Sequence, residues 1–254
     1  MTGVLRPAAL RDEWAWLRTG EPSPPLYEPG LTAGLPAAAQ RWLAHSLRPG
    51  TPLWSSVELT MSGQIKLGPS WRPFQARQIL APQKGFIWAA EARVGGLPVR
   101  GYDRFSKGAG QMRWRLLGVL PVVTAGGADV SRSAAGRLAS EGVLVPTAFR
   151  SAAWSAGLSP DTAVMTRVID GEAEDVTLRV DPSGALTEVS MLRWGTPGGA
   201  PPGRHPFGVS IEAETEFGGV TLPSILRAGW WKGTSGRSDD GEFFRARISK
   251  AVFR

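Results

Sequence analysis

Short segments in which apolar and polar residues alternate recur along most of the chain, and no other feature limits the fold as strongly. The alternation is clear in residues 57–67, 86–94, 112–116 and 207–217, and a period of two is typical of β-strands that bury one face. Further segments of this kind fit at 73–80, 98–105, 163–170, 174–181, 186–194, 219–231 and 242–253, which gives about ten or eleven strands. The connections between them are too short for the crossovers that parallel strands need. The sequence therefore predicts an antiparallel sheet.

Three segments depart from this alternation and carry apolar residues at helical spacing. They predict helices over residues 5–18, 35–47 and 129–142, and the third continues into a short helix that ends near Leu158. The third helix interrupts the series of strands without a flexible linker. We therefore expect a mainly β (β-rich α+β) fold: one curled antiparallel sheet or half-barrel, with the two N-terminal helices and the central helical segment packed on its concave face.

The domain organisation follows from a Pro- and Gly-rich stretch at residues 21–34, which is too rich in breakers to hold a packed element. Residues 1–34 are predicted to form an N-terminal helix and linker, and residues 35–254 a single β-rich domain. No apolar stretch is long enough to span a bilayer, and the N-terminal residues lack the apolar core of a secretory signal. On these grounds we expect a cytoplasmic protein.

The residue types that are scarce in this chain exclude several kinds of chemistry. The 254 residues include no Cys and only two His, His45 and His205. Disulfides, thiolate zinc sites, iron–sulfur clusters and a Cys nucleophile are therefore excluded, as is a three-His metal site. The chain also lacks the phosphate-binding loop, the dinucleotide-binding fingerprint, the nucleophile elbow and the zinc-protease motif. We predict no metal and no cofactor.

The positive charge of the chain is concentrated in one region. The formal net charge is +7, and residues 72–115 hold nine basic and two acidic residues, which accounts for the whole excess. One interpretation is a basic surface that docks an acidic partner. The other is that these side chains cover the solvent side of strands and pair with Glu212, Glu214 and Glu216. Nucleic acid is not expected as a partner, because no recognised reader motif accompanies the charge.

Two carboxylates are predicted to be partly buried. Glu141 ends the central helix directly before an apolar run, and Asp103 shares a strand face with Val99 and Phe105. A buried carboxylate needs a partner or acquires a raised pKa. The pair could therefore bind a ligand head group, act as an acid and a base, or hold arginines that fix the helix to the sheet.

The tryptophans have two interpretations as well. Trp88, Trp114, Trp194 and Trp231 fall on predicted strands, and Trp154 lies beside the central helix. Large indoles either line a deep apolar pocket or fill a core.

Several motifs resemble those of an uncharacterised bacterial family known as a domain of unknown function. They are G-Y-D-R-F at 101–105, S-R-S-A-A-G-R-L-A-S-E-G-V-L-V-P-T-A-F at 131–149, L-R-W at 192–194, H-P-F-G at 205–208 and G-E-F-F-R-A-R-I at 241–248. The resemblance covers about residues 35–254. The family is in turn similar in fold to the LolA/LppX-like lipoprotein carriers, whose half-barrels receive acyl chains under covering helices. Those carriers are exported, whereas this sequence shows no lipobox cysteine.

Together, the pattern and the resemblance predict a non-enzymatic binding module for a lipid or other hydrophobic ligand. The candidate ligand-binding residues are Asp103, Arg104, Trp114, Glu141, Trp154, Arg193, Trp194, Trp231 and Arg245. Two alternatives stay open: an enzyme that uses Glu141 and Asp103 with arginines on an anionic small molecule, and an interaction domain that uses the basic 72–115 region. A peripheral contact with a membrane stays open too, and nothing in the sequence predicts the oligomeric state.

Overall fold

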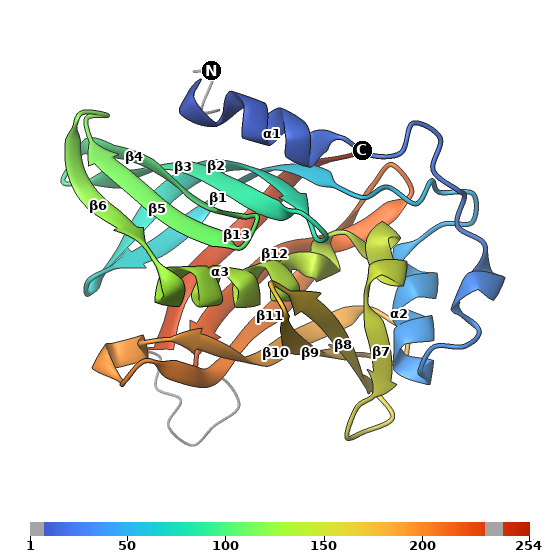
Figure 1. Cartoon of the computed structure of the whole chain (residues 1–254). Coiled ribbons are helices and arrows are strands. Elements are labelled where there is room, and N and C mark those ends of the chain that lie inside the picture. The colour runs from blue at the N-terminus through green and yellow to red at the C-terminus, as the bar shows by residue number, and fades with distance from the viewer. Residues whose placement is uncertain (1–7, 232–240) are drawn as a thin grey trace.

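The computed structural model describes residues 8–231 and 241–254, and all its strands belong to one antiparallel sheet (Figure 1). The thirteen strands are β1 (Val57–Leu67), β2 (Ser70–Ala81), β3 (Gly85–Val94), β4 (Leu97–Ser106), β5 (Ala109–Leu116), β6 (Leu120–Gly126), β7 (Ala153–Ala156), β8 (Thr162–Ile169), β9 (Glu172–Val180), β10 (Leu186–Gly195), β11 (Gly203–Phe217), β12 (Val220–Trp230) and β13 (Glu242–Phe253). Their spatial order is β6-β5-β4-β3-β2-β1-β13-β12-β11-β10-β9-β8-β7. The predicted mainly β, antiparallel fold is confirmed, with more strands than expected.

The sheet curls but does not close, because its two edge strands, β6 and β7, pair with only one neighbour each. Helix α3 (Ala128–Glu141) follows β6 and lies in the opening between the two arms of the sheet (Figure 1). It packs against β4 and β5 on one arm and against β8, β9 and β10 on the other. The predicted central helix is thus present, and it connects the two arms across the concave face.

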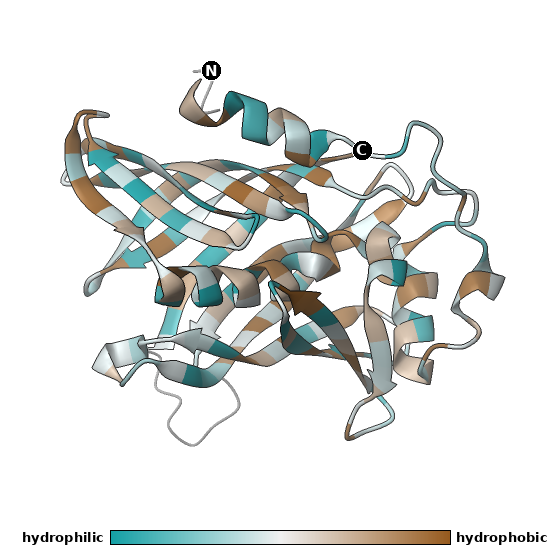
Figure 2. Cartoon of the chain, in the orientation of Figure 1, coloured by the Kyte–Doolittle hydropathy of each residue, from teal (hydrophilic) through white to brown (hydrophobic). Residues whose placement is uncertain are grey.

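The alternation in the sequence separates two faces of the sheet, as the colouring along the strands in Figure 2 shows. On the concave face, Leu80, Phe86 and Trp88 belong to the main core together with residues of α3. On the convex face, Ile79 and Ile87 form a second, smaller core with α1 (Arg11–Arg18). The first N-terminal helix therefore packs on the convex face and not on the concave face as expected. The first residues of that predicted helix lie outside the described part of the chain.

The second N-terminal helix, α2 (Ala37–Ser46), joins the main core as its apolar stripe predicts. Trp42 and Leu43 are fully buried, and the helix packs against β7, β8, β9 and β12. It covers one end of the curled sheet (Figure 1).

Two regions of the sheet differ from the prediction. The segment expected to continue as a helix to Leu158 forms two short 3-10 turns (Gly142–Leu144 and Pro146–Ser151) and then β7. The reason is that Val145, before the second turn, is not helical, and Ala152, after it, is extended. Strand β6 was not predicted, since both of its faces are exposed and it shows no alternation. No helix among the described residues is long and apolar enough to cross a membrane.

The basic region does lie on the solvent side of strands, but its predicted ion pairs are wrong. Arg77, Arg100 and Arg104 pair with Glu58, Glu91 and Glu13, respectively. Glu212, Glu214 and Glu216 pair instead with Arg227, His45 and Arg48. The reason is the strand order, which places β1, β13 and β12 between β11 and the basic strands.

Candidate ligand-binding site

A cavity of about 530 Å³ lies between α3 and the concave face of the sheet. Most of its wall is apolar, with aromatic rings from five strands and aliphatic side chains between them. The rings are Phe86, Trp88, Trp194, Phe207, Trp230, Phe243 and Phe244, and the aliphatic residues include Met61, Ile65, Val189, Val209, Ile211, Leu226 and Ile248. A cavity of this size and lining is typical of small-molecule sites.

Helix α3 runs along the cavity from one end to the other. The wall at the start of the helix includes the exposed residues Asp129 and Thr196. The wall beyond the end of the helix includes Val143 and Leu144, which are buried. The cavity therefore extends from a solvent-facing rim into the core.

Trp194 lies at the solvent-facing rim of the cavity. Its indole nitrogen donates a hydrogen bond to Asp129 Oδ1 at 3.1 Å, and the guanidinium of Arg132 lies 4.7 Å from the centre of its ring. These contacts connect β10 to the start of α3 on the solvent side. The rim is thus held by polar contacts between the helix and the sheet.

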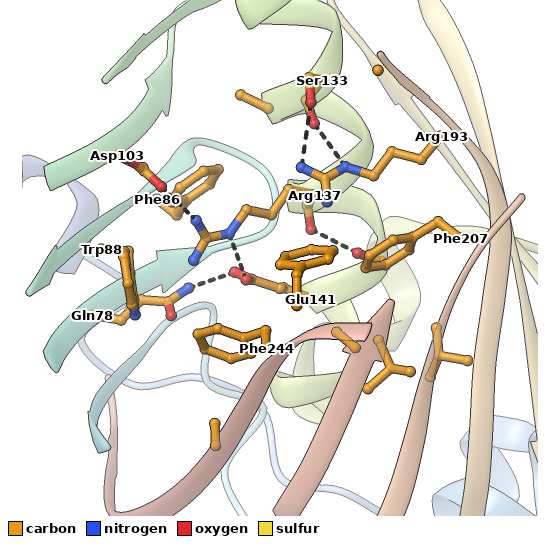
Figure 3. Close-up of a pocket in the computed structure, with 18 of the residues that line it drawn as sticks. Gln78, Phe86, Trp88, Asp103, Ser133, Arg137, Glu141, Arg193, Phe207 and Phe244 are labelled. Carbon is orange, nitrogen blue, oxygen red and sulfur yellow. Dashed lines mark hydrogen bonds and ion pairs between the residues drawn. The ribbon is translucent and has the colours of Figure 1, made fainter. Parts of the chain in front are cut away.

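Inside the cavity, Arg137 of α3 is held by two carboxylates (Figure 3). Its Nε donates to Glu141 Oε1 at 2.7 Å, and its Nη1 donates to Asp103 Oδ2 at 3.3 Å. Gln78 donates to the second oxygen of Glu141, and Trp114 donates to the second oxygen of Asp103 at 2.9 Å. We refer to Gln78, Asp103, Trp114, Arg137 and Glu141 as the Arg137 cluster. It satisfies all four carboxylate oxygens from within the chain.

The pKa of Asp103 is raised by its burial, although the positive charge of Arg137 and the hydrogen bond from Trp114 oppose the shift. The nearby charge of Glu141 adds a smaller upward contribution. Desolvation of the charged form is thus the dominant influence on this carboxyl group.

Arg193 of β10 enters the same cavity from the other arm of the sheet (Figure 3). Its Nε donates to the carbonyl oxygen of Ser133 at 3.1 Å, and its Nη2 lies 3.4 Å from the Ser133 hydroxyl. The guanidinium also lies 4.9 Å and 5.4 Å from the ring centres of Phe207 and Trp230. Among the described residues, no carboxylate forms an ion pair with it. Because a guanidinium carries five N–H donors, Arg193, which lines the cavity, has donors beyond those that contact Ser133.

The surroundings of Arg193 also show why a glycine occurs inside α3. A Cβ atom added at Gly136 would lie 3.0 Å from Arg193 Cγ, so the aliphatic stem of the arginine occupies that space. Burial, and secondarily the positive charge of Arg137, lower the pKa of Arg193 to about 10. Arg193 therefore remains charged at neutral pH.

The structure brings most of the predicted site residues to this cavity. Asp103, Glu141, Arg193 and Trp194 line it, and Trp114 lies behind Asp103. Arg104 borders the cavity, but its guanidinium pairs with Glu13 at 3.0 Å on the convex face.

Three predicted residues lie elsewhere. Trp154 packs on Trp42 in the core, Trp231 packs on His205, and Arg245 pairs with Glu242. Trp230 lines the cavity in place of Trp231, as the period of two from Leu222 through Ala228 would have predicted. Arg137 was also missed, although its position four residues before Glu141 on a helix favours an ion pair. Phe207 and Phe244 lie in two of the family motifs but were not among the candidates, and Gln78 gave no separate signal.

The two histidines do not add acid–base groups to the cavity. His45 Nε2 lies 2.7 Å from Glu214, and His205 Nε2 lies 2.9 Å from the Pro201 carbonyl oxygen. In the described part of the chain, no cluster of three His, Asp or Glu side chains could hold a metal ion.

The fold and cavity define a class of protein: an open, curled antiparallel sheet with a helix across its concave face and an apolar cavity beneath the helix. Within this class, the chain belongs to a family of unknown function, DUF6544, whose model matches residues 25–238. The predicted membership of such a family is confirmed. No curated protein matches the chain.

The chain is also similar to solved structures, three of which have sequence identities to it of 8% to 11%. A LolA superfamily protein from Nitrosomonas europaea is 8% identical, with a TM-score of 0.47 over 86% of this chain and 92% of that chain. A domain described as an outer membrane lipoprotein-sorting protein from Vibrio parahaemolyticus is 11% identical, with a TM-score of 0.39 over 85% and 91%. A DUF1329 family protein from Desulfovibrio piger is 10% identical, with a TM-score of 0.40 over 85% and 90%.

Proposed function

We propose that this protein binds a hydrophobic ligand with a long apolar chain, such as a lipid, in the cavity beneath α3. The observation that carries the proposal is the largely apolar cavity of about 530 Å³ that extends from a solvent-facing rim to the core. Burial of apolar ligand surface against such a wall stabilises a complex in proportion to the area removed from water. Several buried residues of the main core, among them Phe86, Trp88 and Phe207, line this space.

The polar groups of the cavity support a ligand with an acidic head group. Arg193 lines the cavity and has donors beyond those that contact Ser133, and Phe207, Phe244 and Ile248 belong to the apolar wall. An acid group that accepted hydrogen bonds from Arg193 would leave the chain of the ligand against this wall. Charge-assisted hydrogen bonds of this type are among the stronger polar contacts in proteins.

Acid–base catalysis by Asp103 and Glu141 has less support. Both line the same cavity, but each already accepts a hydrogen bond from Arg137 and another from Trp114 or Gln78. Such contacts make the carboxylates fixed parts of the wall. We therefore favour binding over catalysis.

Native mass spectrometry of the purified protein, followed by lipid extraction, tests the proposal. The unmodified protein should retain a hydrophobic adduct or take up added palmitate in a 1:1 complex. Ala246→Phe, a change at a buried residue of the cavity wall on β13, should lose this complex because the new ring occupies the cavity.

Ser249→Phe is the matched control, since Ser249 is an exposed residue of the same strand. It should bind as the unmodified protein does. The proposal is overturned if the unmodified protein neither retains nor takes up a hydrophobic molecule, or if Ala246→Phe binds equally well.

A further inference from the structure

A second cavity, of about 500 Å³, shares no lining residue with the first. It lies where the turns after β2 and β4 meet the end of β8, next to α3. In Figure 1 the C-terminal half of α3 passes between these two arms of the sheet. Its charged and polar lining comes from three separate parts of the sheet and from the turn that ends at Ser151: Gln83, Lys84, Lys107, Ser151, Arg167 and Asp170.

Arg167 of β8 is the most unusual residue of this second cavity. It is 3% exposed, and its Nη1 donates to the Ser151 hydroxyl at 2.7 Å. Its Nε is buried and has no hydrogen-bond partner, and no carboxylate among the described residues forms an ion pair with it. A buried charge without a counterion is costly for a folded protein.

The chain does pair another buried charge in the same arm of the sheet. Glu174 on β9 is 2% exposed, and Arg204 donates to both of its oxygens, at 2.8 Å and 3.0 Å. Arg167 has no such partner. Its Nε lies against Gly142, so the donors left for an anion from outside the chain are those of the two terminal nitrogens beyond the bond to Ser151.

Two features keep the Arg167 guanidinium in place. A Cβ atom added at Gly142 would lie 2.8 Å from Arg167 Nε, so the absence of a side chain there makes room for the guanidinium. Ser151 accepts from Arg167 and donates to the Ala148 carbonyl oxygen at 2.7 Å. Burial lowers the pKa of Arg167 to about 10, so the side chain stays charged at neutral pH.

Two lysines add positive charge to the same wall. Lys107 is exposed, and its Nζ lies 5.2 Å from the ring centre of Trp16. Lys84 Nζ donates to the carbonyl oxygens of Trp16 and Thr19. The lining thus has three basic residues and one acidic residue, Asp170, whose carboxylate lies against Gly108.

From this arrangement we infer that the second cavity is a binding site for a phosphate-type oxyanion, held by Arg167 and Lys107. A tetrahedral oxyanion offers several acceptors, and the planar guanidinium can donate to two of them while an ammonium group reaches a third. The oxyanion could be a free phosphate or the phosphate of a lipid head group. The inference is independent of the hydrophobic ligand proposed for the first cavity.

Isothermal titration calorimetry with inorganic phosphate at low ionic strength tests the inference on the full chain. The unmodified protein should bind phosphate saturably in a 1:1 ratio. Arg167→Gln should weaken binding by about tenfold or more, the factor that corresponds to the loss of one or two charged hydrogen bonds. Lys107→Gln changes an exposed side chain and should weaken binding by a smaller factor without affecting the fold.

Arg113→Gln is the control for net charge, because Arg113 is an exposed residue of β5 outside this cavity. It should bind phosphate as the unmodified protein does. Saturable binding that Arg167→Gln and Lys107→Gln weaken and Arg113→Gln does not would support the site. The inference is overturned if the unmodified protein shows no saturable binding, or if Lys107→Gln and Arg113→Gln reduce it equally.

Cosedimentation with phosphatidylcholine vesicles, with and without phosphatidylglycerol, separates the two sources of phosphate. Binding to the anionic vesicles that depends on Arg167 and Lys107 and that free phosphate competes away would assign a lipid head group. Saturable binding of free phosphate, without vesicle binding that depends on these residues, would assign a soluble anion. Both outcomes support the site, and the absence of both overturns it.

Discussion

Arg137 and Arg193 lie in the same cavity and carry the same charge, but their surroundings differ. Arg137 donates to two carboxylates, and these in turn accept from Trp114 and Gln78. Arg193 donates only to the backbone and hydroxyl of Ser133 and otherwise lies beside aromatic rings. The first arginine forms ion pairs within the chain, and the second forms none with the residues that the structure describes.

This difference indicates which arginine holds the fold together and which is available to a ligand. The Arg137 cluster connects α3 to strands β2 and β4 of one arm, so its ion pairs hold the helix over the cavity. Arg193 has donors to spare inside an apolar wall, where a ligand with an acidic group would find few competing water molecules. Removal of each arginine should therefore have a different consequence.

The largest expected effect on stability follows from removal of Arg137. Arg137→Met would leave Asp103 and Glu141 without their shared counterion in a largely buried setting. Loss of one partner from a buried ion pair costs about 3 kcal/mol or more. Urea denaturation should show this decrease in the free energy of unfolding, and a decrease of less than about 1 kcal/mol would show that the cluster does not stabilise the fold.

Arg193→Met should have a smaller effect on stability, within about 1 kcal/mol of the unmodified protein. Methionine keeps an aliphatic stem beside Gly136. The charge that is removed is repelled by Arg137 and attracted by Glu141, Asp103 and Glu174, so these influences oppose one another. The same denaturation experiment provides the comparison. If Arg193→Met lowers the free energy of unfolding as much as Arg137→Met does, Arg193 also stabilises the fold. That result would contradict the proposed difference between the two arginines.

The smallest expected effect is a change in how stability depends on pH. Burial raises the pKa of Asp103. At pH values between its ordinary pKa and the raised one, the folded protein therefore retains a proton on Asp103 that the unfolded chain has released. The stability that this group contributes is complete below its ordinary pKa of 3.8 and is lost as the pH rises through the raised value.

Comparison of the unmodified protein with Asp103→Asn isolates that contribution. As the pH rises above 3.8, the free energy of unfolding of the unmodified protein should fall relative to that of Asp103→Asn. If the free energy of unfolding of the unmodified protein instead rises relative to that of Asp103→Asn, the positive charge of Arg137 lowers the pKa of Asp103 by more than burial raises it.

Much of the sheet could be predicted because its strands bury one face. Strands β1, β5 and β11 follow the alternation that the sequence shows. Strand β3 was also predicted, although it is buried on both faces, with Phe86 and Trp88 in the main core and Ile87 in the smaller one. Helix α3 begins and ends within a residue of its predicted bounds. Strand β6 could not be found this way, because as an exposed edge strand it has no buried face to impose a pattern. The face on which α1 packs was not predictable either, since an amphipathic helix does not indicate which side of a sheet it covers.

The candidate site was less predictable than the fold. Asp103 and Glu141 were recognised as buried carboxylates, but their common partner Arg137 depends on how α3 sits over β4. Arg193 came from a family motif, and its lack of a carboxylate partner is a property of tertiary structure alone. The cavity itself depends on space that remains between side chains, which the order of residues does not reveal.

The most direct test of whether Arg193 recognises an acidic head group in the cavity compares two ligands that differ only in their head group. Titration calorimetry should measure the affinities of palmitate and of the neutral alcohol of the same chain length for the unmodified protein and for Arg193→Met. We predict that the unmodified protein binds both and prefers the acid by about tenfold, and that Arg193→Met binds both without this preference. Equal affinities of the unmodified protein for the acid and the alcohol would contradict the role of Arg193, and binding of neither would contradict the proposed hydrophobic ligand.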